Sequence, residues 1–247
     1  MRNQVISLYD YTGQALIPWA EAGYDCYAYD IQHKAAPEDN PSLYRIRSGG
    51  SIYYFKADLY DLNTLRRLIS LHLDQAAFMS AFPPCADLES SGRRRWPKKE
   101  KINPHFQTDA VSRVLLSDWF AGVLGCPYYI ENPVGALSRL WHKPDYRFDP
   151  CDFGGYLPED DVHPKWPEVI PARDAYRKRT CLWTGGGFKM PMKRSVPQDP
   201  PVWFVPFFGS VKSYTRRDAP RGFARAVFQF NRPSPVLVVD DREEKDA

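Results

Sequence analysis

The chain has 247 residues, 43% of them hydrophobic and 15% aromatic, which is enough to build a sizeable core and excludes disorder over most of its length. No apolar run approaches the roughly 18 residues of a membrane span, and residues 1–9 are too few and too polar for a signal peptide. The net charge of +3 conceals a basic run at residues 93–101, where six basic side chains stand against one glutamate. We therefore expect a soluble, cytoplasmic protein without a membrane partner.

The N-terminal half alternates short apolar segments with segments of helical periodicity, and this alternation predicts a parallel α/β sheet. Each expected strand is short and apolar, and each expected helix has apolar residues at helical spacing. In chain order we expect a strand at 5–9, a helix at 15–22, strands at 25–30 and 52–56, a helix at 62–73, a strand at 76–82, a helix at 108–124 and a strand at 127–130. The basic run is expected in a loop.

The proline distribution separates the C-terminal part from the rest. The chain holds 23 prolines, many of them beyond residue 140, which predicts loops rather than a regular repeat of strands and helices. Regular elements are expected there only at residues 180–183, 202–208 and 223–230. We divide the chain into a sheet-forming core, a loop-rich completion of the same domain and an acidic, disordered tail, at residues 1–140, 141–239 and 240–247.

Three of the expected strands end in residues that suit an adenosyl ligand. Ligands of open parallel sheets bind outside the carboxyl ends of the strands. Gly13 allows close backbone approach, while Asp30 and Asp58 offer a ribose partner and an adenine partner. A nicotinamide cofactor would use the same scaffold, but residues 10–14 read DYTGQ and lack the GxGxxG fingerprint. The alternative is an ordinary tight turn beside two solvent-facing acids.

A rigid arm presents one thiol at the end of the strand expected at residues 76–82. Pro83 and Pro84 precede Cys85, and such fixed placement favours a reacting atom. Five cysteines without a CxxC pair predict reduced thiols, so one of them can serve as a nucleophile. Carbon methylation of cytosine needs a thiol, because C5 becomes nucleophilic only after a thiolate adds to C6. The alternative for a single cysteine is a small buried hydrophobic side chain.

A carboxyl group follows the strand expected at residues 127–130, in the sequence Glu131-Asn132-Pro133. A partly dehydrated glutamate with a raised pKa can protonate or hydrogen-bond N3 of cytosine while a thiolate attacks C6. Glu131 and Cys85 would then point at the same edge of the sheet. The alternative is a strand-end turn with a surface glutamate.

Taken in this order, the three motifs resemble the DNA (cytosine-5) methyltransferase family, specifically its compact, virus-associated, Dcm-like members. The resemblance spans roughly residues 4–230 and is concentrated in residues 6–13, 83–85 and 131–133. It implies a Rossmann-like class I methyltransferase sheet, S-adenosyl-L-methionine (AdoMet) as cofactor and double-stranded DNA as partner. It also implies the host cytoplasm if the protein is viral, where methylation would protect DNA from restriction.

The resemblance implies a set of cofactor contacts. Tyr9 matches the aromatic residue that packs on adenine, Asp30 the ribose-binding acid and Asp58 the acid that contacts adenine. The family's first motif has an aspartate where this chain has Ser7 and a glycine where it has Tyr11. Residues 220–224 stand near the place of the family's last AdoMet motif. The further cofactor contacts implied are Thr12, Gly13, Ile31, Leu59 and Pro83.

The resemblance also implies the catalytic groups. Cys85 matches the nucleophile and Glu131 the partner of N3. Arg177 and Arg179 match the two arginines of the family's QxRxR motif, which contact the cytosine and hold the catalytic groups. The neighbouring substrate contacts implied are Pro84, Asn132 and Pro133.

The basic run begins eight residues after Cys85, where the family has a mobile loop that closes over extruded DNA. Trp96 would serve there as an apolar wedge or a base-stacking group. The alternative is a solvated charged loop or an import-like patch. No cysteine or histidine pair has the spacing of zinc ligands, so we expect no metal. The phosphate contacts expected in the run are Arg93, Arg94, Arg95, Lys98 and Lys99.

These observations predict an enzyme that transfers a methyl group from AdoMet to C5 of cytosine in DNA through a covalent Cys85 adduct. Sequence specificity is expected to be short or relaxed, because only about forty residues separate Arg179 from Pro220. One alternative is the same chemistry on a free cytosine nucleotide or single-stranded nucleic acid. Another is a non-catalytic nucleic-acid-binding descendant. No obligate protein partner is evident.

Overall fold

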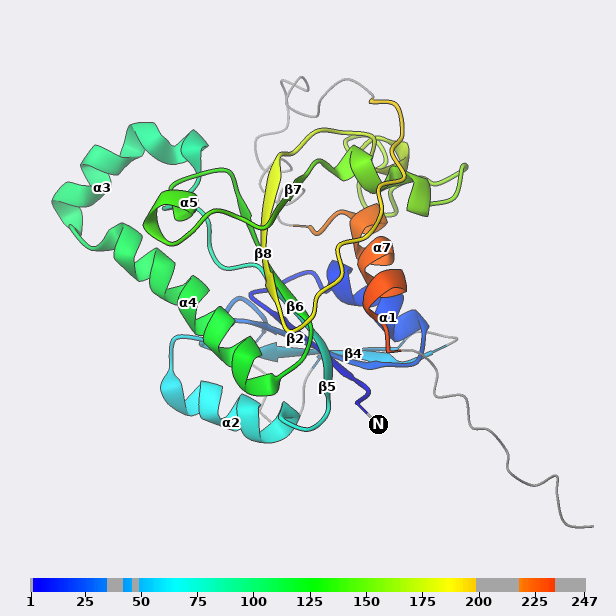
Figure 1. Cartoon of the computed structure of the whole chain (residues 1–247), viewed down its shortest axis with the longest axis horizontal. Helices are drawn as coiled ribbons and strands as arrows, with labels where there is room; N and C mark the ends of the chain where they lie inside the picture. Colours follow the sequence, from blue (N-terminus) through cyan, green and yellow to red (C-terminus); the bar gives the residue numbers. More distant parts are fainter. Residues whose placement is uncertain (1, 35–41, 46–48, 199–217, 234–247) are drawn as a thin grey trace, which may run out of the picture.

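The computed structural model describes residues 2–34, 42–45, 49–198 and 218–233 (Figure 1). In this part of the chain, eight strands form one mixed sheet in the order β3-β4-β2-β1-β5-β6-β8-β7. The α/β sheet predicted from the sequence is therefore confirmed. The strands are β1 (Gln4–Leu8), β2 (Asp25–Asp30), β3 (Ser42–Arg45), β4 (Ser51–Lys56), β5 (Ala76–Ala81), β6 (Tyr128–Pro133), β7 (Tyr146–Phe148) and β8 (Thr180–Gly185). The strand expected at 202–208 and the acidic tail lie outside the described residues.

Five central strands, β4-β2-β1-β5-β6, run parallel. From β1 the chain moves outward through β2 to β4, then returns to the other side of β1 and continues through β5 to β6. The order thus reverses between β1 and β5, which is where ligands bind in doubly wound sheets. At the far edge, β8 runs antiparallel to both β6 and β7, and β3 runs antiparallel to β4 at the other edge.

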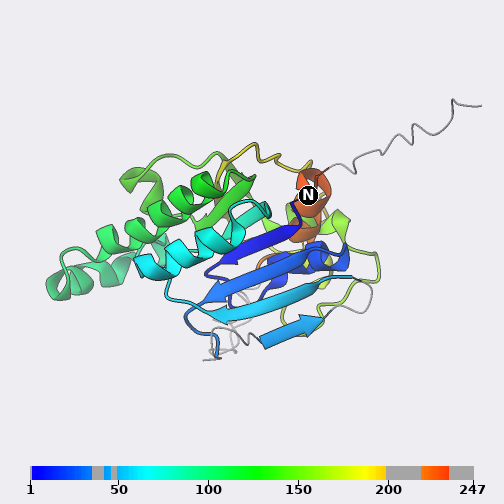
Figure 2. The ribbon, with the colours of Figure 1, turned by 90° about the horizontal axis from the view of Figure 1, so that it is seen from below.

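Helices cover both faces of the sheet (Figure 2). α2 and α4 pack on one face, and α1, preceded by the 3-10 turn η1 (Gln14–Leu16), packs with α7 on the other. None of the helices in the described ranges is long and apolar enough to span a membrane. The helices are α1 (Ile17–Glu21), α2 (Leu62–His72), α3 (Trp96–Ile102), α4 (Phe106–Leu124), α5 (Leu137–Leu140) and α7 (Arg221–Asn231), with shorter 3-10 turns η2 (Ser90–Arg95), η3 (Pro150–Tyr156) and η4 (Ala172–Asp174).

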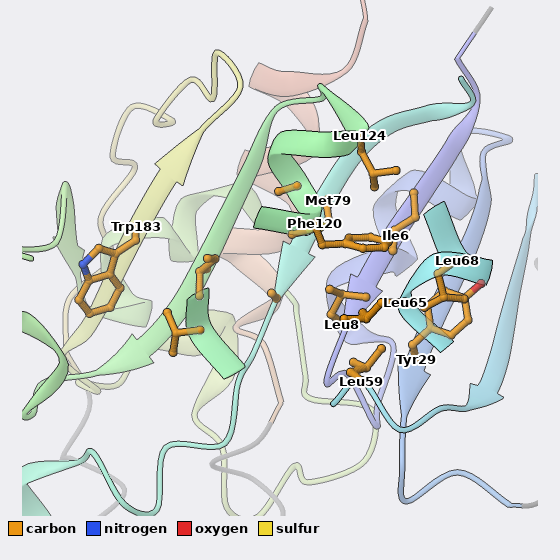
Figure 3. Close-up of a cluster of buried hydrophobic side chains, with 14 of the residues drawn as sticks. Ile6, Leu8, Tyr29, Leu59, Leu65, Leu68, Met79, Phe120, Leu124 and Trp183 are labelled. Carbon is orange, nitrogen blue, oxygen red and sulfur yellow. The ribbon is translucent and has the colours of Figure 1, made fainter. Parts of the chain in front are cut away.

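The central strands β1 and β5 are mainly apolar because both of their faces are buried. Successive side chains of a strand point to opposite faces, so Ile6 joins the cluster under α2 and α4 (Figure 3) while Val5 joins the cluster under α1 and α7. On the second face, the ring of Trp19 lies 4.9 Å from Phe78 and 5.2 Å from Phe228, measured between centroids. These contacts join the first helix, the central strand β5 and the last helix.

Two local expectations are wrong. The strand expected to end at residue 130 continues as β6 to Pro133, because β8 pairs with it along its whole length and opposes Glu131 with Leu182. The basic run is helical rather than a loop, since it forms η2 and α3. Its lysines are good helix formers, and a proline fits the first turn of a helix.

One buried histidine makes the stability of the fold depend on pH. His72, only 1% exposed, lies with Nε2 2.7 Å from the Tyr29 hydroxyl and Nδ1 2.7 Å from the side-chain oxygen of Gln4. Burial lowers the pKa of His72 from 6.5 to about 4. The unfolded chain therefore binds a proton more readily between these two values. The folded state is therefore most stable, as far as His72 is concerned, above about pH 6.5. Its free energy of unfolding decreases as the pH falls from 6.5 toward 4.

We expect the His72→Gln variant to lose less stability on acidification than the wild type. Between pH 7 and pH 5, the titration of His72 should remove about 2 kcal/mol from the free energy of unfolding. Urea unfolding at both pH values measures this difference. His163, whose pKa burial also lowers to about 4, contributes to the remaining loss. The exposed His105→Gln variant is the control, and an equal effect of both substitutions would contradict the assignment to His72.

Candidate active site at the carboxyl ends of the strands

The turn after β1 is built around the buried carboxylate of Asp10. Its Oδ1 accepts the backbone N–H groups of Gly13 at 2.7 Å and Thr12 at 3.1 Å, and its Oδ2 accepts the Ser7 hydroxyl at 2.8 Å. Ser7 in turn accepts a hydrogen bond from the hydroxyl of Ser80 on β5 at 2.9 Å. Sequence reasoning missed Asp10, although an aspartate two and three residues before Thr12 and Gly13 is the pattern of an Asx turn.

This arrangement limits which ligands the turn can take. In phosphate-binding turns, the backbone N–H groups point at the ligand. Here two of them already donate to the carboxylate of Asp10. Burial raises the pKa of Asp10, and the hydrogen bonds from Ser7, Gly13 and Thr12 oppose that rise. The turn therefore suits a ligand that approaches the backbone closely but brings no phosphate.

Only glycine fits at position 13. Gly13 has φ 66°, in the left-handed region, and a Cβ there would lie 2.5 Å from the hydroxyl oxygen of Tyr54 on β4. The same hydroxyl donates to the carbonyl of Thr12 at 3.3 Å. The turn is thus held against β4 on one side and against Ser7 on the other.

Tyr9, Asp30 and Asp58 come together at this edge of the sheet. Tyr9, half-buried and with φ 55°, directly follows β1. Burial raises the pKa of its hydroxyl above the usual range, and the nearby charges of Arg113, Asp58 and Asp30 also act on it. Asp30 ends β2 and Asp58 follows β4, so three strands each contribute one group. The position of these residues at the carboxyl ends of the expected strands predicted this juxtaposition.

The two residues next to these acids differ in exposure. Ile31, beside Asp30, is 55% exposed and offers an apolar surface at the edge. Leu59, beside Asp58, is buried in the core under α2 (Figure 3). Asp30 accepts the N–H of Gln32 at 2.7 Å, which fixes its side chain. Of the two, only Ile31 can therefore contact a ligand through its side chain.

Cys85 and Glu131 lie close enough for their charges to interact. Burial raises the pKa of the Cys85 thiol to about 11, and the carboxylates of Glu131 and Glu89 raise it further, while Lys178 lowers it. Burial also raises the pKa of Glu131, again opposed by Lys178. Both side chains are half-buried. The structure therefore joins a thiol, a carboxyl group with a raised pKa and an ammonium group.

Asn132 ties the arm that carries the thiol to β6. Its side chain is fully buried, and its amide donates to the carbonyl of Pro83 at 3.0 Å. Its Oδ1 atom has no hydrogen-bond partner among the described residues. Pro83 is buried, whereas Pro84 is exposed and Pro133 is half-buried at the end of β6. The hydrogen bond from Asn132 thus fixes the backbone of the arm at Pro83. Of the three prolines, Pro84 is the one exposed at the surface.

The loop after Cys85 is also attached to the segment after β6. The N–H of Ala136 donates to the carbonyl of Leu88 at 2.7 Å, and Glu89 forms an isolated antiparallel bridge with Gly135. Gly135 has no space for a side chain, because a Cβ would overlap the carbonyl of Leu88. Cys85 and Glu131 are therefore held on one connected backbone unit.

A small cavity opens beside Glu131, between β6 and the start of α7. Three charged side chains line it, Glu131, Lys178 and Asp218. Burial raises the pKa of Asp218 to about 6, and its neighbours include Asp10 as well as the opposing Lys178. Neither Lys178 nor Asp218 was expected from the sequence. The remaining lining residues are Phe82, Tyr129, Phe148, Ala219, Pro220 and Phe223.

Neither of the two arginines expected near the catalytic groups lines this cavity. Arg177 is exposed. Arg179 is 61% exposed and pairs with Asp149 through Nε and Oδ2 at 3.1 Å. Lys178, the residue between the two arginines, is half-buried. Lys178 is accordingly the basic residue of this motif that lines the cavity.

Some side chains of the basic run are exposed, whereas Trp96 and Lys99 contact other parts of the protein. Trp96 is half-buried against the core, and its indole N–H has no hydrogen-bond partner within the described chain. Lys99 pairs with the carboxylate of Asp87, two residues after Cys85. The ring of Trp96 and the ammonium of Lys99 therefore serve the packing of this segment. The basic side chains that remain exposed are Arg93, Arg94, Arg95, Lys98 and Lys101.

Comparison with known proteins adds no relative. No family model matches the chain, and no curated protein matches it in a sequence search. Among the described residues, no group of three or more His, Cys, Asp or Glu side chains could hold a metal ion. The chemistry of the site must therefore be inferred from its own groups. A thiol beside a protonated carboxyl group can add to one end of a conjugated ring system while the acid protonates the other.

Proposed function

We propose that this protein transfers a methyl group from AdoMet to C5 of cytosine in DNA through a covalent adduct of Cys85. The observation that carries the proposal is the meeting of Cys85 and Glu131 at the carboxyl edge of a doubly wound sheet, next to the edge formed by Tyr9, Asp30 and Asp58. The sheet order is compatible with the Rossmann-like methyltransferase sheet that the sequence resemblance implies.

The residues at the first three strand ends fit AdoMet. Tyr9 would pack on the adenine, Asp30 would bind the ribose hydroxyls, and Asp58 would contact the adenine edge. The carboxylate of Asp10 disfavours phosphate-bearing ligands such as dinucleotides, because it takes the N–H groups of Thr12 and Gly13. AdoMet has no phosphate, and when bound it supplies an electrophilic methyl group on a sulfonium.

The chain's own groups would carry the rest of the reaction. Cys85 loses its Sγ proton to solvent, and the thiolate forms a bond to C6 of an extruded cytosine. Glu131 gives its proton to N3, which accepts the electron pair displaced through the ring and leaves C5 nucleophilic. After C5 has gained the methyl group, a base or water removes the C5 proton. The C6–S bond then breaks, its electron pair returns to Sγ, and the N3 proton returns to Glu131.

The exposed arginines of the basic run would contact the phosphates of DNA. η2 and α3 stand out from the body of the molecule, immediately after the loop that carries Cys85 (Figure 1). Arg93, Arg94 and Arg95 are all exposed there. Phosphate contacts supply affinity without sequence information, which fits a short or relaxed recognition sequence.

We expect each of the substitutions Arg93→Ala, Arg94→Ala and Arg95→Ala to weaken DNA binding similarly for unrelated sequences. Each should also reduce the slope of log affinity against log salt by about 0.9, because one counterion-releasing contact is lost. Fluorescence anisotropy between about 50 and 200 mM salt measures both quantities. Arg66→Ala, on the exposed side of α2, is the control. Unchanged slopes in all three variants would place the DNA elsewhere.

The decisive experiment offers labelled AdoMet with duplex DNA, single-stranded DNA, RNA and deoxycytidine nucleotides side by side. We expect duplex DNA to accept most of the label. Preferential transfer to a nucleotide or to a single strand would identify the alternative substrate. AdoMet binding by calorimetry without transfer to any acceptor, or no AdoMet binding at all, would point to a nucleic-acid-binding protein without this activity.

A further inference from the structure

His33, in the turn after β2, connects two other segments of the adenosyl edge through its ring. The residue is only 8% exposed. Its Nδ1 lies 2.9 Å from the carbonyl oxygen of Phe55 on β4, and its Nε2 lies 3.2 Å from the carbonyl oxygen of Tyr11. Tyr11 belongs to the turn after β1, two residues before Gly13. The imidazole therefore bridges the glycine turn to β4 across the end of β2.

Both partners of this ring are carbonyl oxygens, which accept hydrogen bonds and cannot donate them. A neutral imidazole has one N–H, so it can satisfy one of these carbonyls and must turn a lone pair toward the other. An imidazolium has two N–H groups and can donate to both. His72 differs, because the Tyr29 hydroxyl can donate to one of its nitrogens while the other donates to Gln4. The neutral ring thus suits His72, whereas the charged ring suits His33.

The aromatic side chains around His33 favour a positive charge in its ring. The ring of Tyr11 stacks on the imidazole, with centroids 5.6 Å apart and planes inclined by 28°, and the face of a tyrosine ring attracts a cation. The ring of Tyr54 on β4 lies at 86° to the imidazole, with centroids 5.3 Å apart. The carboxylates of Asp10 and Asp30 accept backbone N–H groups of their own turns. The other charged side chains of these three segments are the exposed Lys34, Lys56 and Asp58.

We propose that His33, in its imidazolium form, clamps the turn after β1 to β4 and thereby positions this turn for its ligand. Release of one ring proton to solvent removes one of the two hydrogen bonds and frees one side of the clamp. Ligand affinity at the turn should therefore fall as the pH rises through the titration of His33. That the ligand is AdoMet rests on the proposed function, whereas the clamp does not. His33 acts through the backbone of Tyr11, so it is a positioning residue.

The first test uses the full chain without a ligand. Imidazole ¹⁵N spectra between about pH 5 and pH 8 follow the protons of His33. We expect two slowly exchanging ring N–H protons at the acidic end and the loss of one as the pH rises. Over the same range, amide exchange at Thr12 and Gly13, corrected for its intrinsic pH dependence, should become about tenfold faster, the size of one lost hydrogen bond.

Two variants without a titrating ring provide the comparison. In His33→Gln and His33→Asn, the corrected exchange at Thr12 and Gly13 should be fast at every pH, and thermal unfolding verifies that each variant is folded. His105→Gln changes an exposed histidine and should keep the wild-type profile. A neutral His33 ring at the acidic end, or the same exchange profile in the wild type and both His33 variants, would overturn the proposal.

Calorimetry with AdoMet separates the clamp from the proposed function. We expect the wild type to bind AdoMet about tenfold more tightly than His33→Gln at about pH 6 and about equally at about pH 8. The amino group of AdoMet also titrates near pH 8, but a comparison of the two proteins at each pH cancels its effect. A titrating clamp in a protein that binds no AdoMet would retain the role of His33 and reject the methyltransferase function. An affinity ratio that does not change with pH, in a protein that methylates DNA, would do the reverse.

Discussion

Replacing Cys85 with alanine is expected to lower methyl transfer by at least about 10³-fold, because the substitution removes the nucleophile without which C5 cannot react. Transfer of labelled methyl groups from AdoMet to duplex DNA measures the loss. The control is Cys126→Ala, which removes a thiol that is buried near the start of β6 and away from the pocket. Retention of methylation by Cys85→Ala would overturn the mechanism.

DNA containing 5-fluorocytosine provides an independent measure of the same adduct. Fluorine at C5 blocks the elimination that would release the enzyme, so wild-type protein should remain attached to the DNA in the presence of AdoMet. Denaturing electrophoresis detects the complex, and Cys85→Ala should give none. Methylation of ordinary DNA without trapping on the fluorinated DNA would show that no covalent adduct forms.

Replacing Glu131 with glutamine is expected to reduce turnover by about 10²-fold or more, the usual contribution of a general acid or base. Glutamine keeps the shape of the side chain and can still donate a hydrogen bond, but it cannot transfer a proton to N3. AdoMet affinity should change little, because Glu131 lies on β6 whereas the proposed adenosyl edge is formed at β1, β2 and β4. Methyl transfer gives the turnover, and calorimetry gives the affinity.

A remote glutamate provides a matched control for the exchange of glutamate for glutamine. Glu159→Gln changes an exposed glutamate in a loop and should leave both quantities near the wild-type values. If Glu131→Gln weakened AdoMet binding as much as it slowed turnover, Glu131 would belong to the cofactor edge instead of the base pocket.

The central sheet was predictable because its strands are buried on both faces. Residues 5–9 and 76–82 are apolar apart from Ser7 and Ser80, and a glycine or an aspartate stands near most strand ends. The edge strands β3 and β7 were not expected, since they have four and three residues and owe their existence to pairing with β4 and β8. The extension of β6 to Pro133 has the same origin, because its local sequence resembles a turn.

The site was predictable where function depends on position at a strand end. Tyr9, Asp30 and Asp58 are such residues, and the structure brings them together. Lys178 and Asp218 could not be identified, because their role arises from contacts with Glu131 across 47 and 87 positions of sequence. Asp10 could have been identified, since its hydrogen bonds are local.

The packing of α7 has a consequence for how the chain is made. The aromatic cluster on its face of the sheet combines Trp19 and Phe78 with Phe223 and Phe228, so its parts leave the ribosome more than 140 residues apart. Until residues 221–231 emerge, η1 and α1 cover this face of the early strands only in part. Contacts between such distant segments slow folding, and the open face invites association with other nascent chains. A nascent chain that stalls before residue 221 would therefore be incompletely folded, and chaperones would bind its exposed apolar surface.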